Sequence, residues 1–188
     1  VTNGKCTLWT RTRKTITSMP HIVAELEKAC VGKPDIILDG ELYNHKFKSN
    51  FEKIVSAVRL ETPDPEKYKD VYYHVYDLAM ADATWAERMV LLDLFFNAPD
   101  RIQLFDHVQQ VASTLLNNDS DVEQLFDCST AVGYEGIMLR NTNGLYANKR
   151  SYDLQKVKSF DDAEFDIIGI EEGRGKLAGH AGAFICRM

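Results

Sequence analysis

The sequence predicts an α+β fold, because segments with the composition of strands alternate along the chain with segments whose apolar residues recur at helical spacing. Of its 188 residues, 45% are hydrophobic, which is enough for an ordinary globular core. It contains no internal repeat, no low-complexity tract and no apolar stretch long enough to span a bilayer. This length suits one complete domain, or one domain and part of a second.

The N-terminal part predicts a hairpin turn at Asn3-Gly4 and then a strand over residues 5–11, which are rich in β-branched and aromatic side chains. Residues 20–31 predict a helix, because apolar residues recur at helical spacing and a proline lies near the first turn. A second strand is predicted over residues 35–43.

The middle of the chain contains capping boxes, in which a Ser or Thr and a later Glu satisfy free backbone donors at a helix start. The pairs are Ser49 with Glu52, Thr84 with Glu87, and Ser120 with Glu123. The helices that follow are expected to run roughly through Arg59, Asn97 and Val132. Strands are predicted over residues 71–79 and 107–113, and a charged loop over residues 61–69.

A domain boundary is predicted near Asp161, so residues 1–160 would form one domain and residues 161–188 would begin another. The second segment predicts a strand over residues 165–171 and ends in an apolar run over residues 183–186. It is too short to bury a core of its own, so we expect the first hairpin of a longer domain.

The formal net charge of −6 argues against a wholly basic surface, so any nucleic acid would have to bind at a local basic stripe. Candidates for that stripe are Arg11, Arg13, Lys14, Lys149, Arg150, Lys156 and Lys158. The four cysteines are widely separated and form no Cys-x-x-Cys pair. They predict neither a zinc site nor a compact disulfide framework, and a reducing compartment is expected.

Asp39 and Glu41 are candidate site residues on the second predicted strand. Side chains alternate across a strand, so the two carboxylates share one face. Gly40 lies between them, and its missing side chain would let a ligand approach the backbone. The pair therefore fits a metal or ribose site, although the residues alone favour a solvent-facing strand with a turn glycine.

Tyr76 and Arg11 are further candidates on strands. Tyr76 shares a face with His74, and an aromatic ring beside an ionisable group can stack on a nucleobase, although core packing explains most strand tyrosines. Arg11 and Arg13 share a face of their strand, and they could grip phosphates or simply face water.

Lys156 and Lys158 lie on one face of a short apolar run, and Glu135 opens another apolar run. Two ammonium groups side by side cost energy unless an anion lies between them or both face water. A polyphosphate is such an anion, with a metal-binding acid opposite. A solvated edge strand, in which lysine guards against aggregation, explains the two lysines equally well.

Taken in order, these segments resemble the covalent nucleotidyltransferases, and most closely the ATP-dependent DNA ligases. The family shows an arginine strand motif, an Asp-Gly-Glu motif, an aromatic-Asp strand, a Glu-Gly motif and a Lys-x-Lys motif. They stand here as Thr10-Arg11-Thr12-Arg13-Lys14, Leu38-Asp39-Gly40-Glu41-Leu42, Val75-Tyr76-Asp77, Tyr134-Glu135-Gly136-Ile137-Met138-Leu139-Arg140 and Leu154-Gln155-Lys156-Val157-Lys158. Each motif alone is weak, but the ordered set covers nearly the whole chain and is specific.

The resemblance implies a nucleotidyltransferase (ATP-grasp-like) adenylation domain of antiparallel sheets flanked by helices. The glycine-rich segment over residues 173–182 resembles the start of the OB-fold that follows in the family. The implied activity is the sealing of nicks in duplex DNA, with ATP and Mg²⁺ as cofactors. A monomer that does not bind membranes is implied, located in the cytoplasm, in a nucleus or in the cytoplasm of a virus-infected host.

The resemblance also implies roles for individual residues. Glu41 would bind the ribose and help to organise metal, and Glu135 would be the main acidic metal site. Tyr76 would stack on adenine, whereas Arg11 would contact the nucleotide or the DNA end. The lysines of the Lys-x-Lys motif would hold the α-phosphate. The implied catalytic groups are Glu41, Glu135, Lys156 and Lys158.

One motif of the family is missing from the sequence. The nucleophilic lysine that becomes adenylated should lie in a Lys-x-Asp-Gly motif a little before Arg11, upstream of the Asn3-Gly4 turn. Lys5 has neither the following Asp-Gly nor the right position. We therefore expect a fragment, shortened at both ends, that does not form an enzyme–AMP intermediate by itself.

Other functions remain open. An RNA ligase of the same superfamily shares the Glu-Gly and Lys-x-Lys motifs, whereas a capping guanylyltransferase would be expected to show Asp-Gly where Glu135-Gly136 stands. The rival from another class is a non-catalytic module that binds a nucleotide or a DNA end, which the missing lysine supports. A Lys-x-Asp-Gly motif encoded upstream of Val1 would favour the enzyme.

Overall fold

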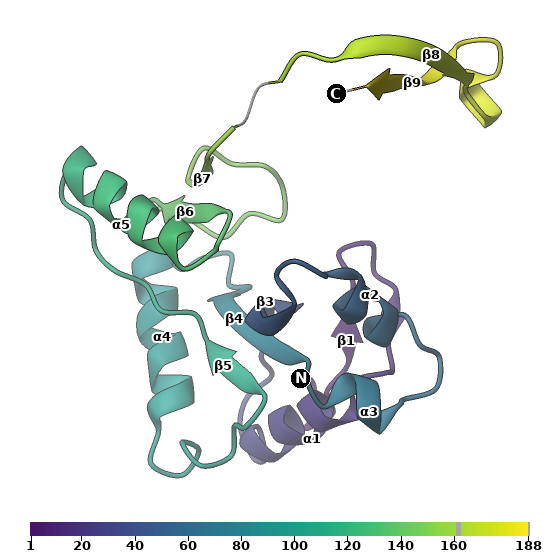
Figure 1. The fold of residues 1–188 in the computed structure, drawn as a ribbon. Coiled ribbons are helices and arrows are strands. Elements are labelled where there is room, and N and C mark those ends of the chain that lie inside the picture. The colour runs from purple at the N-terminus through teal and green to yellow at the C-terminus, as the bar shows by residue number, and fades with distance from the viewer. Residues whose placement is uncertain (161–162, 188) are drawn as a thin grey trace. The chain divides into compact units, whose positions relative to one another are not determined.

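The structure, a computed structural model, describes residues 1–160 and 163–187. Its chain divides into two compact units, Val1–Val157 and Lys158–Met188. The predicted domain boundary near Asp161 lies outside the described residues. The α+β class is confirmed, because helices and small sheets alternate along the chain (Figure 1).

A three-stranded sheet organises the first unit, with β3 (Leu38–Tyr43), β4 (Tyr72–Leu78) and β5 (Val108–Gln110) in the order β3-β4-β5. β3 and β4 are antiparallel, as the family resemblance implied, whereas β4 and β5 are parallel. A parallel pair requires a crossover connection, and helix α4 (Trp85–Asn97) supplies it.

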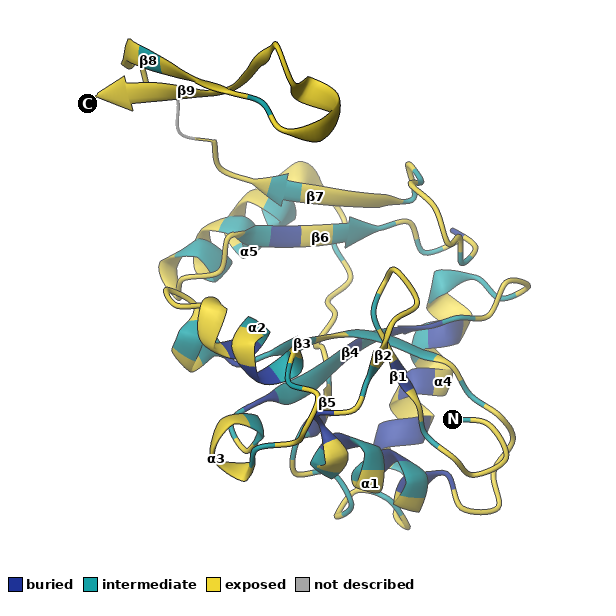
Figure 2. Cartoon of the chain, turned by 90° about the vertical axis from the view of Figure 1, so that its right-hand side faces the viewer, coloured by how far each residue is buried: buried dark blue, intermediate teal, exposed yellow. Residues whose placement is uncertain are grey.

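The hydrophobic core lies where α1 (Pro20–Ala29) and α4 pack against this sheet (Figure 2). Its buried side chains come from one stripe of each helix and from β4. They include Ile22, Leu26, Leu92, Phe95, Phe96, Val75 and Leu78. Val75 and Asp77 are buried, while Tyr76 between them is half-buried, as the predicted alternation requires. The prediction that Leu78 shares the face of Tyr76 is wrong, because Leu78 is buried directly after Asp77.

A β-bulge interrupts the pairing of β3 with β4. Asp39 pairs with Asp77 and Gly40 pairs with Val75, so Tyr76 is the extra residue on β4. A bulge re-aims the side chains beside it, which matters here because Tyr76 is a candidate site residue.

Gly40 leaves room for the neighbouring strand β4 at this bulge. A side chain at Gly40 would come within 2.5 Å of the carbonyl oxygen of His74 and within 2.7 Å of the ring of Tyr73. The expectation that Gly40 leaves room for a ligand is therefore wrong, because β4 already occupies that space.

The N-terminal hairpin is formed by β1 (Leu8–Trp9) and β2 (Thr15–Ile16). The predicted turn at Asn3-Gly4 is confirmed, because its flanking residues bridge across it and the two turn residues have φ of 50° and 72°. The strand predicted over residues 5–11 is too long, since the chain turns directly after β1.

A second, two-stranded sheet consists of β6 (Gly136–Arg140) and β7 (Leu154–Lys158), and helix α5 (Asp119–Ala131) lies against β6. The remaining helical segments of the first unit are short. They are the 3-10 helix η1 (His45–Phe47), α2 (Glu52–Val58) and α3 (Pro65–Tyr68). The predicted charged loop over residues 61–69 thus contains a helical turn, which Asp64 caps.

Only one of the predicted capping boxes forms. The hydroxyl of Thr84 accepts from the backbone of Glu87, whose carboxylate accepts from the backbone of Thr84. The prediction for Ser49 is wrong, because α2 begins after Phe51 without a side-chain cap. The prediction for Ser120 is also wrong, because Asn118 caps α5. At both places another residue lies at the N-cap position.

The second unit contains a β-hairpin of β8 (Asp166–Glu172) and β9 (Ala181–Arg187), connected through the 3-10 helix η2 (Gly175–Leu177). Its side chains are largely exposed, including the apolar Ile167 and Phe184 (Figure 2). The strands agree with the predicted hairpin, while its assignment to an OB-fold stays a prediction. No helix in the described part of the chain is long and apolar enough to cross a membrane.

Replacing Thr84 with alanine should lower the free energy of unfolding by about 1 kcal/mol, because the helix loses its N-cap oxygen. Ser49→Ala and Ser120→Ala are matched controls that should change it much less, since neither hydroxyl caps a helix. Urea titration followed by circular dichroism measures all three variants. Equal losses would contradict the assigned caps.

Candidate functional site

The site begins at the bulge, where the carboxylate of Asp39 lies between two tyrosines. One of its oxygens accepts a hydrogen bond from the hydroxyl of Tyr76 at 3.3 Å, and the other accepts from Tyr146 at 3.0 Å. Burial and then the nearby Asp39 charge raise the pKa of both tyrosines, that of Tyr146 to about 12. Asp39 therefore supports Tyr76 and is already engaged within the protein.

Behind Tyr76 lies a buried ion network centred on Asp77. Its carboxylate accepts from Arg88 of α4 at 2.7 and 3.1 Å and from Arg140 of β6 at 2.8 Å. Asp77 is 0% exposed and Arg88 is 1% exposed. The guanidinium of Arg140 also lies 5.8 Å from the centre of the Tyr76 ring. Because Arg140 belongs to this network, the network holds one side of the Tyr76 ring in place.

Sequence reasoning missed Arg88 and Arg140. A signal for Arg88 was present, since it precedes Leu92, Phe95 and Phe96 at the spacing of one helix face. A charged residue at a position that the periodicity assigns to the core needs a buried partner of opposite charge. The sequence does not say which acid that partner is.

Acids from β3 and from the start of β6 add negative charge around the hydroxyl of Tyr43. Its pKa is raised by burial first, and then by Tyr134, by Glu41 of β3 and by Glu135 at the start of β6. Each acid therefore contributes to the negative surroundings of Tyr43, although the two are far apart in the sequence.

Lys156 pairs with one of these acids. Its ammonium lies 2.8 Å from a carboxylate oxygen of Glu135, and both side chains remain largely exposed, at 50% and 82%. An exposed ion pair contributes little to stability, so an incoming anion can replace one partner at low cost. Glu135 and Lys156 therefore form an exposed acid–cation pair, and Glu41 is a separate exposed acid on β3.

The described residues contain no group of three or more His, Cys, Asp or Glu that could enclose a metal by itself. Mg²⁺ is usually held by one or two carboxylates together with substrate phosphates and water. An exposed carboxylate such as that of Glu135 fits that mode of binding, and the described residues do not form a preformed all-protein metal cage.

Two further predicted site residues contact other parts of the chain. Lys158 belongs to the second unit, and its ammonium lies 4.8 Å from the centre of the Phe160 ring. Arg11 lies in the turn between β1 and β2, where Thr10 and Lys14 bond through their backbones. The expectation that Arg11 and Arg13 share a strand face is wrong, because the chain reverses there and Arg13 has φ of 60°.

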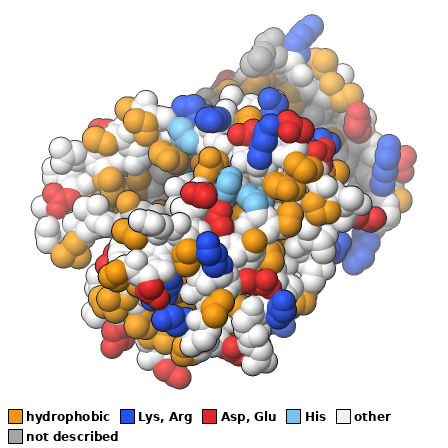
Figure 3. Space-filling model, turned by 90° about the horizontal axis from the view of Figure 1, so that it is seen from below, with side chains coloured by type: hydrophobic (Ala, Val, Ile, Leu, Met, Phe, Trp, Pro, Cys, Tyr) orange, Lys and Arg blue, Asp and Glu red, His pale blue; other side chains and the backbone are white. Residues whose placement is uncertain are grey.

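The basic stripe expected for nucleic acid is not visible on the face shown in Figure 3. Lys and Arg side chains there are scattered among Asp and Glu, in keeping with the net charge of −6. Among the described residues on that face, cations and anions therefore offset one another at short range.

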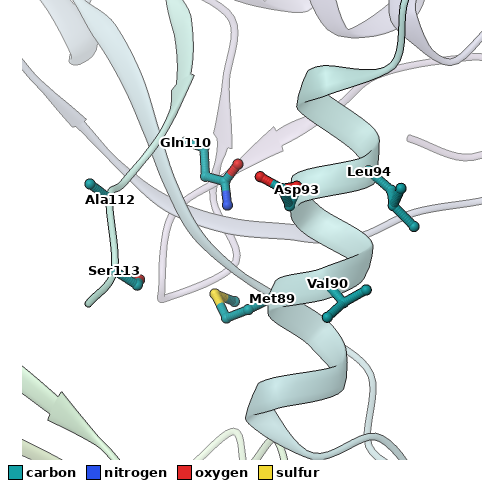
Figure 4. Close-up of a pocket in the computed structure, with 7 residues that line it drawn as sticks. All are labelled: Met89, Val90, Asp93, Leu94, Gln110, Ala112 and Ser113. Atoms are coloured by element: carbon teal, nitrogen blue, oxygen red, sulfur yellow. The ribbon is translucent and has the colours of Figure 1, made fainter. Parts of the chain in front are cut away.

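A separate hollow of about 580 Å³ lies between α4 and the end of β5 (Figure 4). It is lined by Met89, Val90, Asp93, Leu94, Gln110, Ala112 and Ser113. The lining is mostly apolar and its charged group is Asp93, which would repel a phosphate. None of the predicted site residues lines this hollow.

Comparison with known proteins gives a family match over most of the chain. Residues 1–158 match the family described as "ATP dependent DNA ligase domain". The DNA ligase of African swine fever virus (isolate Tick/South Africa/Pretoriuskop Pr4/1996) is 27% identical over 192 residues, which cover 99% of this chain and 44% of that protein. The DNA ligase of Haemophilus influenzae is 24% identical over 159 residues, covering 82% of this chain and 54% of that protein. The chain thus spans about half the length of these relatives.

Solved structures share the fold. One named "Pmar-Lig_PreS3" has a TM-score of 0.82 at 23% identity and covers 98% of this chain and 44% of its own. The structure "New Crystal Structure of Chlorella Virus DNA Ligase-Adenylate" has a TM-score of 0.64 at 22% identity, covering 89% of this chain and 60% of its own. At these sequence identities, the structural similarity establishes the fold of this chain.

Replacing Arg88 with methionine should lower the free energy of unfolding by about 3–5 kcal/mol, because the Asp77 carboxylate loses a partner where water cannot replace it. Lys33→Met is the control, since the pair of Lys33 with Asp100 is exposed. Urea unfolding should detect a large loss in the first variant and hardly any change in the second. A small loss for Arg88→Met would show that the network is not buried as described.

The raised pKa of Tyr146 predicts a loss of stability in alkali. In the unfolded chain a tyrosine ionises near its ordinary value of 10.0, whereas in the folded chain Tyr146 keeps its proton to about 12. Between these values the unfolded chain binds fewer protons, so the free energy of unfolding falls as pH rises. Tyr146→Phe should weaken this pH dependence, and Tyr152→Phe, at a side chain that is 96% exposed, should not. Denaturant unfolding from pH 9 to 12 would measure both slopes, and identical slopes would argue against the burial of the Tyr146 hydroxyl beside Asp39.

Proposed function

Because the chain belongs to the family of ATP-dependent DNA ligase domains, we propose that it supplies the nucleotide site of an enzyme that uses ATP to seal nicks in duplex DNA. The observation that carries this proposal is the exposed pair of Glu135 and Lys156, on the sheet from which Arg140 reaches Asp77 and the ring of Tyr76. The pair offers a carboxylate for a cation and an ammonium for a phosphate.

Each residue of the site has a proposed task in holding the nucleotide. Tyr76 stacks on adenine, with its hydroxyl held by Asp39 and its ring beside Arg140. Glu41 binds the ribose and shares the Mg²⁺ with Glu135. Mg²⁺, when bound, neutralises charge that develops on the phosphate oxygens.

The phosphate contacts are assigned to Lys156, Lys158 and Arg11. Lys156 is paired with Glu135 in this structure, and the α-phosphate of ATP would replace the carboxylate as its partner. Glu135 would then be released toward the cation. Lys158 adds a second ammonium from the same strand, while Arg11 contacts the nucleotide or the DNA end from its exposed turn.

The reaction proposed for the whole protein transfers AMP in three steps. A lysine amine attacks the α-phosphorus of ATP, and the bond to pyrophosphate breaks. The 5′-phosphate of the nick then attacks the same phosphorus and takes the AMP from the lysine. Finally the 3′-hydroxyl attacks the activated 5′-phosphate, the phosphodiester forms and AMP leaves. Lys156 and Lys158 would stabilise the charge on the α-phosphate in the first two steps.

A second candidate function is binding of a nucleotide or a DNA end without covalent chemistry. Residues 1–188 contain no Lys-x-Asp-Gly motif, so binding to this chain can be measured without covalent transfer. Binding and transfer can be separated experimentally. Titration of the chain with ATP and Mg²⁺ tests nucleotide binding alone, whereas nick sealing tests the reaction in a protein that joins this chain to a Lys-x-Asp-Gly segment and a complete OB-fold. Nicked RNA and GTP, supplied in parallel, test the related RNA ligase and guanylyltransferase activities.

In that completed protein, Lys156→Ala and Lys158→Ala should each slow transfer of labelled AMP onto the protein by about 100-fold, because each removes a preorganised cation from the α-phosphate. Lys33→Ala is the control, because Lys33 pairs with Asp100 outside the site. Gel electrophoresis of the labelled protein measures the transfer. Equal rates for the three variants would contradict the assigned phosphate contacts.

A further inference from the structure

The turn that carries Glu135 is held by a segment far away in the sequence. The ring Nε2 of His45 lies 2.9 Å from the carbonyl oxygen of Val132, and the ammonium of Lys48 donates to the same oxygen at 3.0 Å. Val132 is the C-cap of α5. Carbonyl oxygens at a helix C-terminus lack partners within the helix and carry partial negative charge, so two donors from η1 and the residue after it stabilise this end.

His45 also connects this contact to β3. Its Nδ1 lies 2.9 Å from the hydroxyl of Tyr43, the last residue of β3. One neutral tautomer satisfies both bonds, with Nδ1 accepting from Tyr43 and Nε2–H donating to Val132. The ring of Tyr134 lies 4.4 Å from the His45 ring, centre to centre. The imidazole thus contacts the strand, the helix end and the turn at once.

The turn itself is shaped for this contact. Gly133 has φ of 94°, a conformation that glycine adopts readily, and a side chain there would overlap the ammonium of Lys48. The segment that carries His45 is anchored in turn by the buried Asn44. Its side chain donates to the carbonyl of Asp70 at 2.7 Å and accepts from the backbone of Lys46 at 2.9 Å. Neither side of the contact is a freely moving loop.

We propose that Tyr43, His45 and Lys48 form an anchor that positions Glu135 for binding of Mg²⁺ and the nucleotide phosphates. Glu135 follows Tyr134 directly, so a shift of the turn moves its carboxylate. The three residues are positioning residues, since they act through Glu135. This inference rests on the proposed function, because it presumes that Glu135 serves a metal–phosphate site.

The test measures how tightly the chain binds ATP by calorimetry as the concentration of Mg²⁺ is varied. His45→Ala should raise the Mg²⁺ concentration needed for half-maximal tightening about tenfold, the usual result of losing a group that orients a metal ligand. Binding of ATP without Mg²⁺ should stay unchanged. Lys46→Ala, at the exposed neighbour within η1, is the matched control and should leave both quantities unchanged.

A double-mutant cycle separates positioning from general support of the fold. If His45 acts through Glu135, the variant with both His45→Ala and Glu135→Gln should need no more Mg²⁺ than Glu135→Gln alone. His45→Gln, which keeps a donor for Val132, should recover part of the lost affinity, and Tyr43→Phe should lose less than His45→Ala. These milder changes decide the question if His45→Ala does not fold. Faster amide hydrogen exchange at Tyr134–Ile137 in His45→Ala should accompany the loss.

The outcomes distinguish this inference from the proposed function. If the unaltered chain does not bind ATP, the proposed function fails and the role of the anchor fails with it. If the chain binds ATP but His45→Ala leaves the Mg²⁺ requirement and the amide exchange unchanged, only the anchor is wrong. Additive losses in the double-mutant cycle would likewise show that His45 supports the fold without acting through Glu135.

Discussion

The site depends on the buried pairing of Asp77 with Arg88 and Arg140. A carboxylate without solvent exposure is costly unless it is fully paired, and here two guanidinium groups from different elements satisfy it. The pairing connects β4 to α4 on one side and to β6 on the other, so it joins the β3-β4-β5 sheet to the β6-β7 sheet. Since Arg140 also lies beside the ring of Tyr76, the charge that joins the sheets helps to set the aromatic face of the site.

The carboxylates around this network differ in how firmly they are engaged. Asp39 bonds to two half-buried tyrosine hydroxyls and serves as a support. Glu135 and Lys156 meet in an exposed pair, in which solvent screens the attraction and either partner can exchange. A site that must bind and release a phosphate benefits from this division. Its buried pairs keep the geometry, while its exposed pairs can open for the ligand at little cost.

Features governed by neighbouring residues could be predicted from the sequence. The Asn3-Gly4 turn, the Thr84 capping box and the alternation from Val75 to Asp77 are confirmed, because each depends on chemistry within a few residues. The predictions were wrong where a nearby residue took the expected position or the chain turned. Asn118 caps α5 in place of Ser120, and the chain turns at Arg11 where the composition predicted a strand. Glu41, Glu135 and Lys156 were identified from their motifs, and their roles stay predictions.

The sequence by itself determined which segments form helices and strands. It also determined which charged residues cannot be explained by the packing of a hydrophobic core. The tertiary structure decided which of those charges meet. Arg140 lies 63 positions from Asp77, and Val132 lies 87 positions from His45. No local pattern encodes such pairs. They form because burial makes an unpaired charge or carbonyl costly, and the packing of the elements determines which partner is within reach.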